Sequence, residues 1–88
     1  MNPQLSLIDY PCDFPIKVMG QAEQGFAQAI AEVVLRHDPH FNAADIEMRS
    51  SRAARYLSLT CTVRATSREQ LDALYRELCD HPMVVMVL

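Results

Sequence analysis

The sequence has few cysteines, no long apolar stretch and no excess of basic residues. Its three cysteines are odd in number and form no CxxC pair, which argues against a disulfide framework and a cysteine-based zinc site. No segment is apolar over the ~20 residues of a membrane-spanning helix, and the first residues lack the basic start of a signal peptide. We therefore expect a reduced, cytoplasmic protein.

Charge and length limit the possible partners and the number of domains. The net charge of −3 disfavours broad attraction to nucleic acid or anionic lipid. A chain of 88 residues, half of them apolar, is long enough for one core. We expect one domain over residues 13–88 and a tail, residues 1–12, that docks onto it.

The sequence also lacks a recognisable catalytic or metal-binding arrangement. No acid, base and nucleophile occur together in a known pattern. His37 and His40 have HxxH spacing, but Pro39 lies between them, so they are not a helical pair of ligands, and His81 is distant in sequence. We predict no enzyme activity, no metal and no cofactor.

Strand-like and helix-like patterns follow one another along the chain. Apolar residues alternate over 14–19 and, most regularly, over 56–64, which is typical of half-buried strands. Their three- and four-residue spacing over 22–37 predicts an amphipathic helix that ends before Pro39. A capping pattern over 66–70 begins a second helix, which the His81–Pro82 pair ends. Further strands are expected over 46–49 and 83–88.

This order, βαββαβ, predicts an α+β protein with a ferredoxin-like split βαβ fold. We expect a four-stranded antiparallel sheet with two helices on one face and with the first and third strands at its centre. The other face is left open. In the last strand, if Val84, Met86 and Leu88 point inward, then Val85 and Val87 lie outside on an edge without charge.

Four segments resemble the YbeD-like family of small bacterial proteins: residues 9–20 (DYPCDFPIKVMG), 58–60 (SLT), 63–65 (VRA) and the His81–Pro82 pair. The resemblance spans nearly the whole chain. It implies a fold similar to ACT regulatory domains, which bind small ligands such as amino acids and often pair through their sheets. It implies no established activity.

Two departures from that family pattern concern surfaces. Where the family usually has a glycine-containing turn and a lysine, this chain reads Ser51-Arg52-Ala53-Ala54-Arg55-Tyr56. Val85 stands where the family often has a lysine, so self-association through the sheet edge becomes more plausible.

The first candidate binding site is the loop after the first strand, Gly20, Gln21 and Ala22. Amides at a helix N-terminus can receive an anion or a carboxylate, and ACT domains use this corner for ligands, so a small carboxylate ligand is one hypothesis. The alternative is that Gly20 only makes a tight turn.

The second candidate is an arginine-rich hairpin. From Met48 to Arg68 the chain has five of its eight basic residues and no acid. Arginine clusters bind phosphates and carboxylates, so anion or nucleic-acid binding is an alternative function. Tyr56 is its one aromatic residue, whereas an RNA-binding sheet displays two or three. A docking surface for an acidic protein and a merely solvated hairpin are the other interpretations.

An acylphosphatase-like enzyme is a weaker alternative. Gly20, Gln24, Gly25 and Phe26 faintly resemble the glycine-bearing loop of acylphosphatases, but Gln28 stands where an arginine would clamp a phosphate. Gly25 is then better explained as a helix residue that permits close packing on the sheet.

We therefore predict a non-catalytic, ACT-like regulatory or interaction module. It would act through its open sheet face, its edge strand or a small ligand at the first strand–helix loop, and its partner could be another copy of itself. The expected interaction surface consists of Lys17, Met19, Arg52, Arg55, Tyr56, Val85 and Val87.

Overall fold

Two long strands with alternating apolar side chains form the centre of the sheet. The computed structural model describes residues 9–88, in which β1 (Cys12–Gln21) pairs antiparallel with β3 (Tyr56–Ala65) along its whole length. The shorter strands β2 (Glu47–Ser50) and β4 (Val84–Val87) pair antiparallel with β3 and β1, so the strand order is β2-β3-β1-β4. The predicted four-stranded antiparallel sheet with β1 and β3 at its centre is confirmed.

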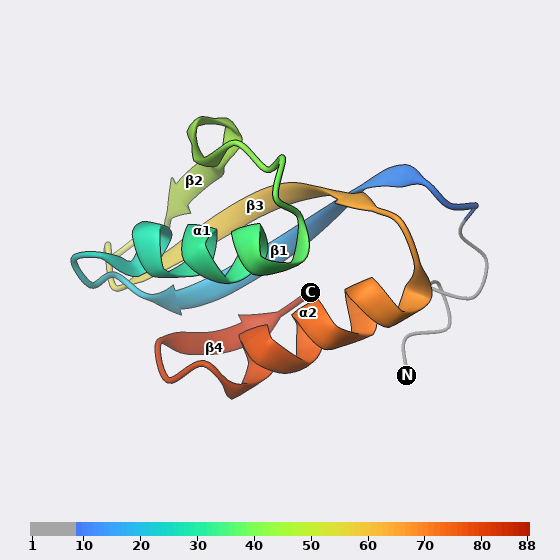
Figure 1. The fold of residues 1–88 in the computed structure, drawn as a ribbon. Helices are drawn as coiled ribbons and strands as arrows, with labels where there is room; N and C mark the ends of the chain where they lie inside the picture. Colours follow the sequence, from blue (N-terminus) through green and yellow to red (C-terminus); the bar gives the residue numbers. More distant parts are fainter. Residues whose placement is uncertain (1–8) are drawn as a thin grey trace.

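Two helices cover one face of this sheet, α1 (Phe26–His37) and α2 (Arg68–Asp80) (Figure 1). A short 3₁₀ helix, η2 (Ala43–Asp45), precedes β2. The apolar residues that recur every second position in the strands and every three or four in the helices are buried between the two layers. The largest fully buried side chains are Phe26, Ile16, Ile30, Leu59, Leu71, Leu74, Leu78, Val18, Val33, Val34, Val63 and Cys61. The ferredoxin-like prediction is confirmed.

The tail predicted over residues 1–12 is only partly described, since residues 1–8 lie outside the described part of the chain. Tyr10 is half-buried and packs against the core. β1 begins at Cys12, so the sheet starts one residue before the expected domain boundary.

The prediction that α1 begins at Ala22 and contains Gly25 is wrong. Gly25 caps the helix from outside with a left-handed φ of 85°, and α1 begins at Phe26. A Cβ added at Gly25 would have no neighbour within 4 Å, so close packing is not the reason for a glycine here. The reason is the backbone conformation, which side chains with a Cβ rarely adopt.

Gly20 does not stop β1 as expected, since the strand continues to Gln21. Gly20 is buried, and a Cβ there would lie 2.5 Å from Cζ of Phe26 and closer still to the carbonyl oxygen of Met83. The ring of Phe26 and the carbonyl oxygen of Met83 therefore fill the space that a side chain at position 20 would need, so the glycine allows this close packing.

In β4, the expected outward position of Val87 is wrong. Val18 pairs with Val87 and Met19 with Met86, but Gly20 pairs with Val84, so Val85 is an extra residue opposite a shift in register. Such a bulge changes the face on which the following side chains lie. Val84 and Val87 pack against the core, whereas Val85 and Met86 are exposed.

Asp38, which follows α1, connects this helix to β3. Its side chain accepts hydrogen bonds from the backbone amides of Arg64 (3.0 Å, Oδ2) and His40 (3.2 Å, Oδ1). The residue is only 5% exposed, and bonds of this kind satisfy a carboxylate that burial would otherwise disfavour.

Gln70 joins three segments at the same end of the sheet. Its Nε2 donates to the carbonyl oxygens of His37 (2.8 Å) and Arg64 (3.1 Å), and its Oε1 accepts from the amide of Thr66 (2.6 Å). The amide of Gln70 in turn donates to Oγ of Ser67 (3.1 Å), the N-cap of α2. The predicted capping pattern is confirmed, with Thr66 as the second partner.

Glu77 on α2 bonds the last turn of α1. Its carboxylate accepts from Arg36 and lies 2.7 Å from Nε2 of His37. The hydrogen bonds from Arg36 and His37 lower the pKa of Glu77, and the same contact raises the pKa of Arg36. The two helices are thus joined near the C-terminal end of α1.

Candidate functional site

The turn between β2 and β3 forms without glycine. Ser51 holds it, because Oγ of Ser51 accepts from the amides of Arg55 (3.2 Å) and Tyr56 (3.1 Å). Ala54 supplies the left-handed residue that the turn requires, with φ 56°. An alanine therefore occupies a left-handed position of the turn, where glycine would be less strained.

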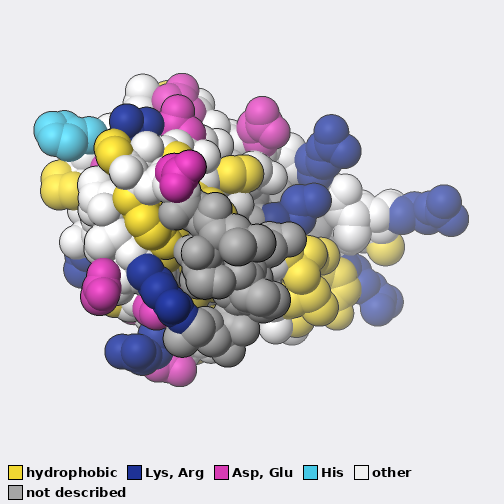
Figure 2. All heavy atoms as spheres, turned by 90° about the vertical axis from the view of Figure 1, so that its right-hand side faces the viewer, with side chains coloured by type: hydrophobic (Ala, Val, Ile, Leu, Met, Phe, Trp, Pro, Cys, Tyr) yellow, Lys and Arg dark blue, Asp and Glu magenta, His cyan; other side chains and the backbone are white. Residues whose placement is uncertain are grey.

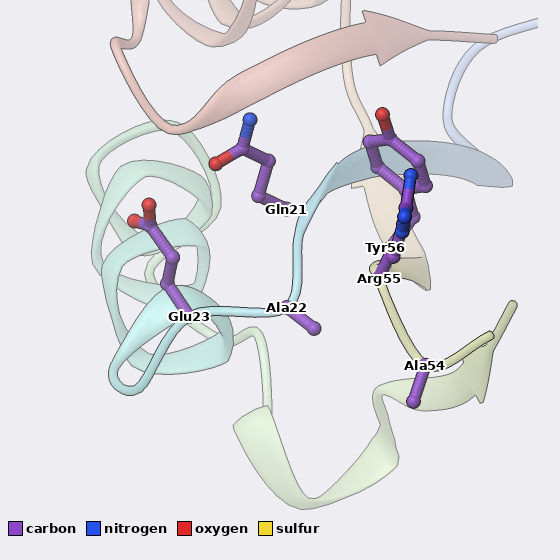
Figure 3. Close-up of a pocket in the computed structure, with 6 residues that line it drawn as sticks. All are labelled: Gln21, Ala22, Glu23, Ala54, Arg55 and Tyr56. Atoms are coloured by element: carbon purple, nitrogen blue, oxygen red, sulfur yellow. The ribbon is translucent and has the colours of Figure 1, made fainter.

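A backbone hydrogen bond joins this turn to the loop after β1. The amide of Ala22 donates to the carbonyl oxygen of Arg55 at 2.8 Å. Between the two segments lies a cavity of 370 Å³, which we call the loop–hairpin hollow (Figure 3). It is lined by Gln21, Ala22 and Glu23 from the loop and by Ala54, Arg55 and Tyr56 from the hairpin.

The two walls of the loop–hairpin hollow carry opposite charges. Figure 3 shows Glu23 with Gln21 on the loop side and Arg55 with Tyr56 on the hairpin side. Within residues 9–88, the side chains of Glu23 and Arg55 form no ion pair. A guanidinium can bind a carboxylate through two hydrogen bonds, and a carboxylate can accept from an ammonium group. The hollow therefore suits a small molecule with both charges.

The structure brings two separately predicted sites together. Gln21 and Ala22 from the candidate loop line the same hollow as Arg55 and Tyr56 from the arginine-rich hairpin. Gly20 lies behind them and is buried. Sequence reasoning missed Glu23 and Ala54 as lining residues, although each is adjacent in sequence to a residue that was proposed.

Other residues of the expected surface lie outside this hollow. Met19 and Tyr56 line a smaller, adjacent recess of 110 Å³ together with Arg49. Arg52 is exposed on the hairpin but does not line the hollow, and Lys17 is exposed on the open sheet face.

The five arginines between residues 48 and 68 do not form one patch. Arg49, Arg52 and Arg55 lie on or beside the hairpin, whereas Arg64 lies near the other end of β3, about 30 Å away at ~3.3 Å per residue. Arg64 pairs with Asp13 (3.2 Å), and Arg68 approaches Asp72 (3.7 Å). Figure 2 shows Lys and Arg side chains projecting at one margin beside a hydrophobic patch, and others mixed with acidic side chains elsewhere.

A second cavity, of 280 Å³, lies at the opposite end of the sheet. Asp13, Asp38, His40, Asp45 and Arg64 are among its lining residues. Asp38 bonds backbone amides and Asp13 pairs with Arg64, so these two acids are already engaged. Residues 9–88 contain no group of three or more His, Cys, Asp or Glu that could hold a metal ion.

The three cysteines occupy different environments. Cys61 is buried in β3, and burial raises the pKa of its thiol to about 11. Cys79 on α2 is exposed, and Cys12 is half-buried. None of the helices within residues 9–88 has the length and apolar character needed to cross a bilayer.

Comparison with known proteins places the chain among small bacterial proteins. Residues 5–88 match the model of a family described as "Protein of unknown function (DUF493)". A UPF0250 protein of Nitrosomonas europaea is 59% identical over 83 residues, covering 94% of this chain and 95% of the relative. A UPF0250 protein of Bordetella pertussis is 63% identical over 86 residues, covering 98% and 94%. The predicted YbeD-like membership is confirmed.

Two solved structures share the fold. The solution structure of protein HP0495 from H. pylori has a TM-score of 0.75 at 17% identity, with 92% of this chain and 85% of that chain covered. The ACT domain from GTP pyrophosphokinase of Chlorobium tepidum has a TM-score of 0.58 at 18% identity, with 88% and 97% covered. The ACT-like fold is therefore confirmed.

Proposed function

Because the chain belongs to the DUF493 family and has an ACT-like fold, we propose that it is a non-catalytic regulatory module that binds a small carboxylate ligand in the loop–hairpin hollow. The observation that carries this proposal is the meeting of two loops distant in sequence. Gln21 and Ala22 share one cavity with Arg55 and Tyr56, and the Ala22–Arg55 backbone hydrogen bond fixes the two segments together.

The charge arrangement favours a zwitterionic ligand such as a free amino acid. Arg55 would bind the carboxylate and Glu23 the ammonium group, while the amide of Gln21 and the ring of Tyr56 contact the remainder. The volume of 370 Å³ lies in the lower part of the ~300–1,000 Å³ range of small-molecule sites. Larger ligands such as nucleotides are therefore disfavoured.

Binding would regulate by adding side-chain contacts between the hairpin and the loop before α1, beyond their one backbone hydrogen bond. The loop that carries Gln21 to Glu23 leads directly into Gly25 and α1, and the other wall is the turn between β2 and β3. A ligand that binds only the folded state, where both walls are in place, stabilises that state by an amount that rises with the logarithm of its concentration above the Kd. A partner that recognises the hairpin or the first turn of α1 would then respond to the ligand.

The test is a screen of the free amino acids by thermal shift, followed by NMR of a ¹⁵N-labelled sample with each hit. A ligand at a hundred times its Kd stabilises by about 2.7 kcal/mol, or roughly 10–20 °C for a domain of this size. We expect chemical-shift changes at Gln21 to Glu23 and at Ala54 to Tyr56.

Arg55→Gln and Arg52→Gln form a matched pair of variants. Both arginines are exposed on the same hairpin, but only Arg55 lines the hollow. We expect Arg55→Gln to weaken binding at least tenfold and Arg52→Gln to leave it within twofold. N-acetylated amino acids should bind more weakly if Glu23 contacts the ammonium group. A flat screen, or equal effects of the two variants, would overturn the proposal.

A further inference from the structure

The recess of 110 Å³ beside the loop–hairpin hollow lies on the open face of the sheet. Val18 and Leu59 point into the core, so their neighbours Met19 and Ser58, which pair across β1 and β3, lie on the open face. Arg49 on β2 pairs with Ser58 from the other side. The short side chain of Ser58 therefore lies between two long ones, which leaves the surface low at this point. Met19, Arg49, Tyr56 and Ser58 are among the lining residues, and we call this space the Ser58 recess.

Tyr56 lines both the Ser58 recess and the loop–hairpin hollow. It pairs with Gln21, and Figure 3 shows these two side chains extending to the same side. Tyr56 and Ser58 are two residues apart on β3, so their Cα atoms are about 7 Å apart along the strand. A small molecule that Arg55 holds in the hollow can therefore extend a side chain past Tyr56 into the recess.

The size and the walls of the Ser58 recess define the side chain that it can receive. Its walls are mainly apolar, whereas those of the loop–hairpin hollow are mainly polar. A water-sized group takes up ~30 Å³, so a space of 110 Å³ holds roughly four of them. The side chains of leucine and methionine have this size. Alanine would leave most of the recess empty, and burying the additional apolar surface of a longer side chain favours binding.

Arg49 is the one lining residue that favours a different side chain. It is exposed and forms no ion pair within residues 9–88, so its guanidinium is free to bind an acidic group. A carboxylate in the recess would lose its water and contact mainly apolar walls, which costs free energy. The recess therefore suits an uncharged side chain better than an acidic one.

From these observations we propose that the Ser58 recess receives the side chain of the bound amino acid, so that the ligand is an apolar amino acid of about the size of leucine or methionine. This inference rests on the proposed binding of an amino acid in the loop–hairpin hollow. Arg55 and Glu23 bind the charged groups that all free amino acids share, and the recess selects among them. A methylene missing from an apolar pocket weakens binding ~10–200-fold, which is enough for such a selection.

The test is isothermal titration calorimetry of the full chain with L-leucine, L-methionine, L-glutamate and L-alanine. Methionine and glutamate have side chains of similar length that differ in charge. We expect leucine and methionine to bind at least tenfold more tightly than glutamate and alanine. If the amino acids bind through Arg55 with equal affinity, or if glutamate binds best, this inference is overturned and the proposed function stands. If no free amino acid binds, both are overturned.

Ser58→Ile and Thr60→Ile are matched variants for the recess. Both residues are half-buried on the open side of β3, but only Ser58 lines the recess. We expect Ser58→Ile to reduce the preference for leucine over alanine to within twofold and Thr60→Ile to leave it at tenfold or more. Equal effects of the two variants would contradict the proposed position of the side chain.

NMR of the wild type with bound leucine keeps the test decisive if Ser58→Ile is poorly folded. We expect nuclear Overhauser effects from the methyl groups of leucine to the ring of Tyr56 and to the methyl group of Met19, because both residues line the recess. Contacts from these methyl groups to other residues only would place the side chain elsewhere and overturn the inference.

Discussion

Where β1 begins and β3 ends, polar side chains bond the backbone of neighbouring elements, whereas at the opposite end of the sheet the charged side chains of Glu23 and Arg55 form no ion pair within residues 9–88. Asp38 and Gln70 bond α1, β3 and the start of α2 at the first end. At the second end, a backbone bond between Ala22 and Arg55 joins the segments. The side chains of Glu23 and Arg55 then remain available to a ligand.

This difference separates residues that stabilise the fold, such as Asp38 and Gln70, from residues that are free to bind a ligand. Asp38 and Gln70 each make a part-buried hydrogen bond to the backbone of a neighbouring element, so the loss of either bond costs stability. Glu23 and Arg55 are exposed and make no such bond, so replacing them should affect binding and leave stability nearly unchanged. Substitutions at the two ends can test this separation.

The largest loss of stability is expected from Gly20→Ala. It would show that the end of the sheet with the loop–hairpin hollow also contains a residue that the fold requires. The new Cβ meets the backbone oxygen of Met83 and the ring of Phe26, so we expect destabilisation of about 3 kcal/mol. Gly25→Ala is the control, where the left-handed φ alone should cost about 1 kcal/mol. Urea unfolding followed by circular dichroism measures both, and equal losses would contradict the packing argument.

Asp38→Ala should destabilise by about 2 kcal/mol, because two backbone amides lose their acceptor. Thermal unfolding should show a Tm lower by roughly 8–16 °C. Asp45 is an exposed acid that lines the same 280 Å³ cavity as Asp38. Asp45→Ala should change the free energy of unfolding by less than about 0.5 kcal/mol. If both variants behave alike, Asp38 does not hold this end of the sheet.

For Gln70, two replacements separate the donors from the acceptor. Gln70→Ala removes all four side-chain hydrogen bonds to His37, Arg64 and Thr66 and should cost about 1 kcal/mol. Gln70→Glu keeps an acceptor for Thr66 but removes the donor to the two carbonyl oxygens. We expect the glutamate variant to be no more stable than the alanine variant in urea unfolding. A fully stable Gln70→Glu would assign the contribution to the Thr66 contact alone.

The smallest effect, and a gain, is expected from Ala54→Gly in the hairpin. Alanine at φ 56° is strained relative to glycine, which offsets the greater flexibility of glycine in the unfolded chain. We expect stabilisation of about 0.5 kcal/mol, measured by the urea midpoint. Ala53→Gly, next to it without a positive φ, should destabilise slightly or have no effect. A loss of stability at position 54 would mean that the turn tolerates alanine without strain.

The fold could be predicted from the sequence because its signals are local. The alternation over β3 and the capping residues Ser67 and Gln70 each depend on a few neighbouring positions. The start of α1 was misplaced because the apolar spacing continues through Gly25, and only the backbone angle shows that the helix has not yet begun. The face of Val87 was wrong because a bulge is a property of two paired strands.

The candidate site was harder to predict because it is formed by long-range contacts. The sequence singled out Gln21 and Arg55 separately, but their sharing of one cavity depends on the register of β1 with β3, in which Gln21 pairs with Tyr56. The same register placed Arg64 far from Arg55, so a cluster in the sequence became two groups in space. Charged residues that are near one another in the sequence therefore need not be near one another in space.

Because Cys61 is buried, its reaction with an alkylating reagent can report local unfolding of the protein. Its side chain is inaccessible, and the pKa of about 11 keeps the thiol protonated at neutral pH, so alkylating reagents can modify it only when β3 becomes exposed. The exposed Cys79 reacts without any such opening. The ratio of the two labelling rates, read by mass spectrometry in intact cells, would report how often the sheet separates from its helices.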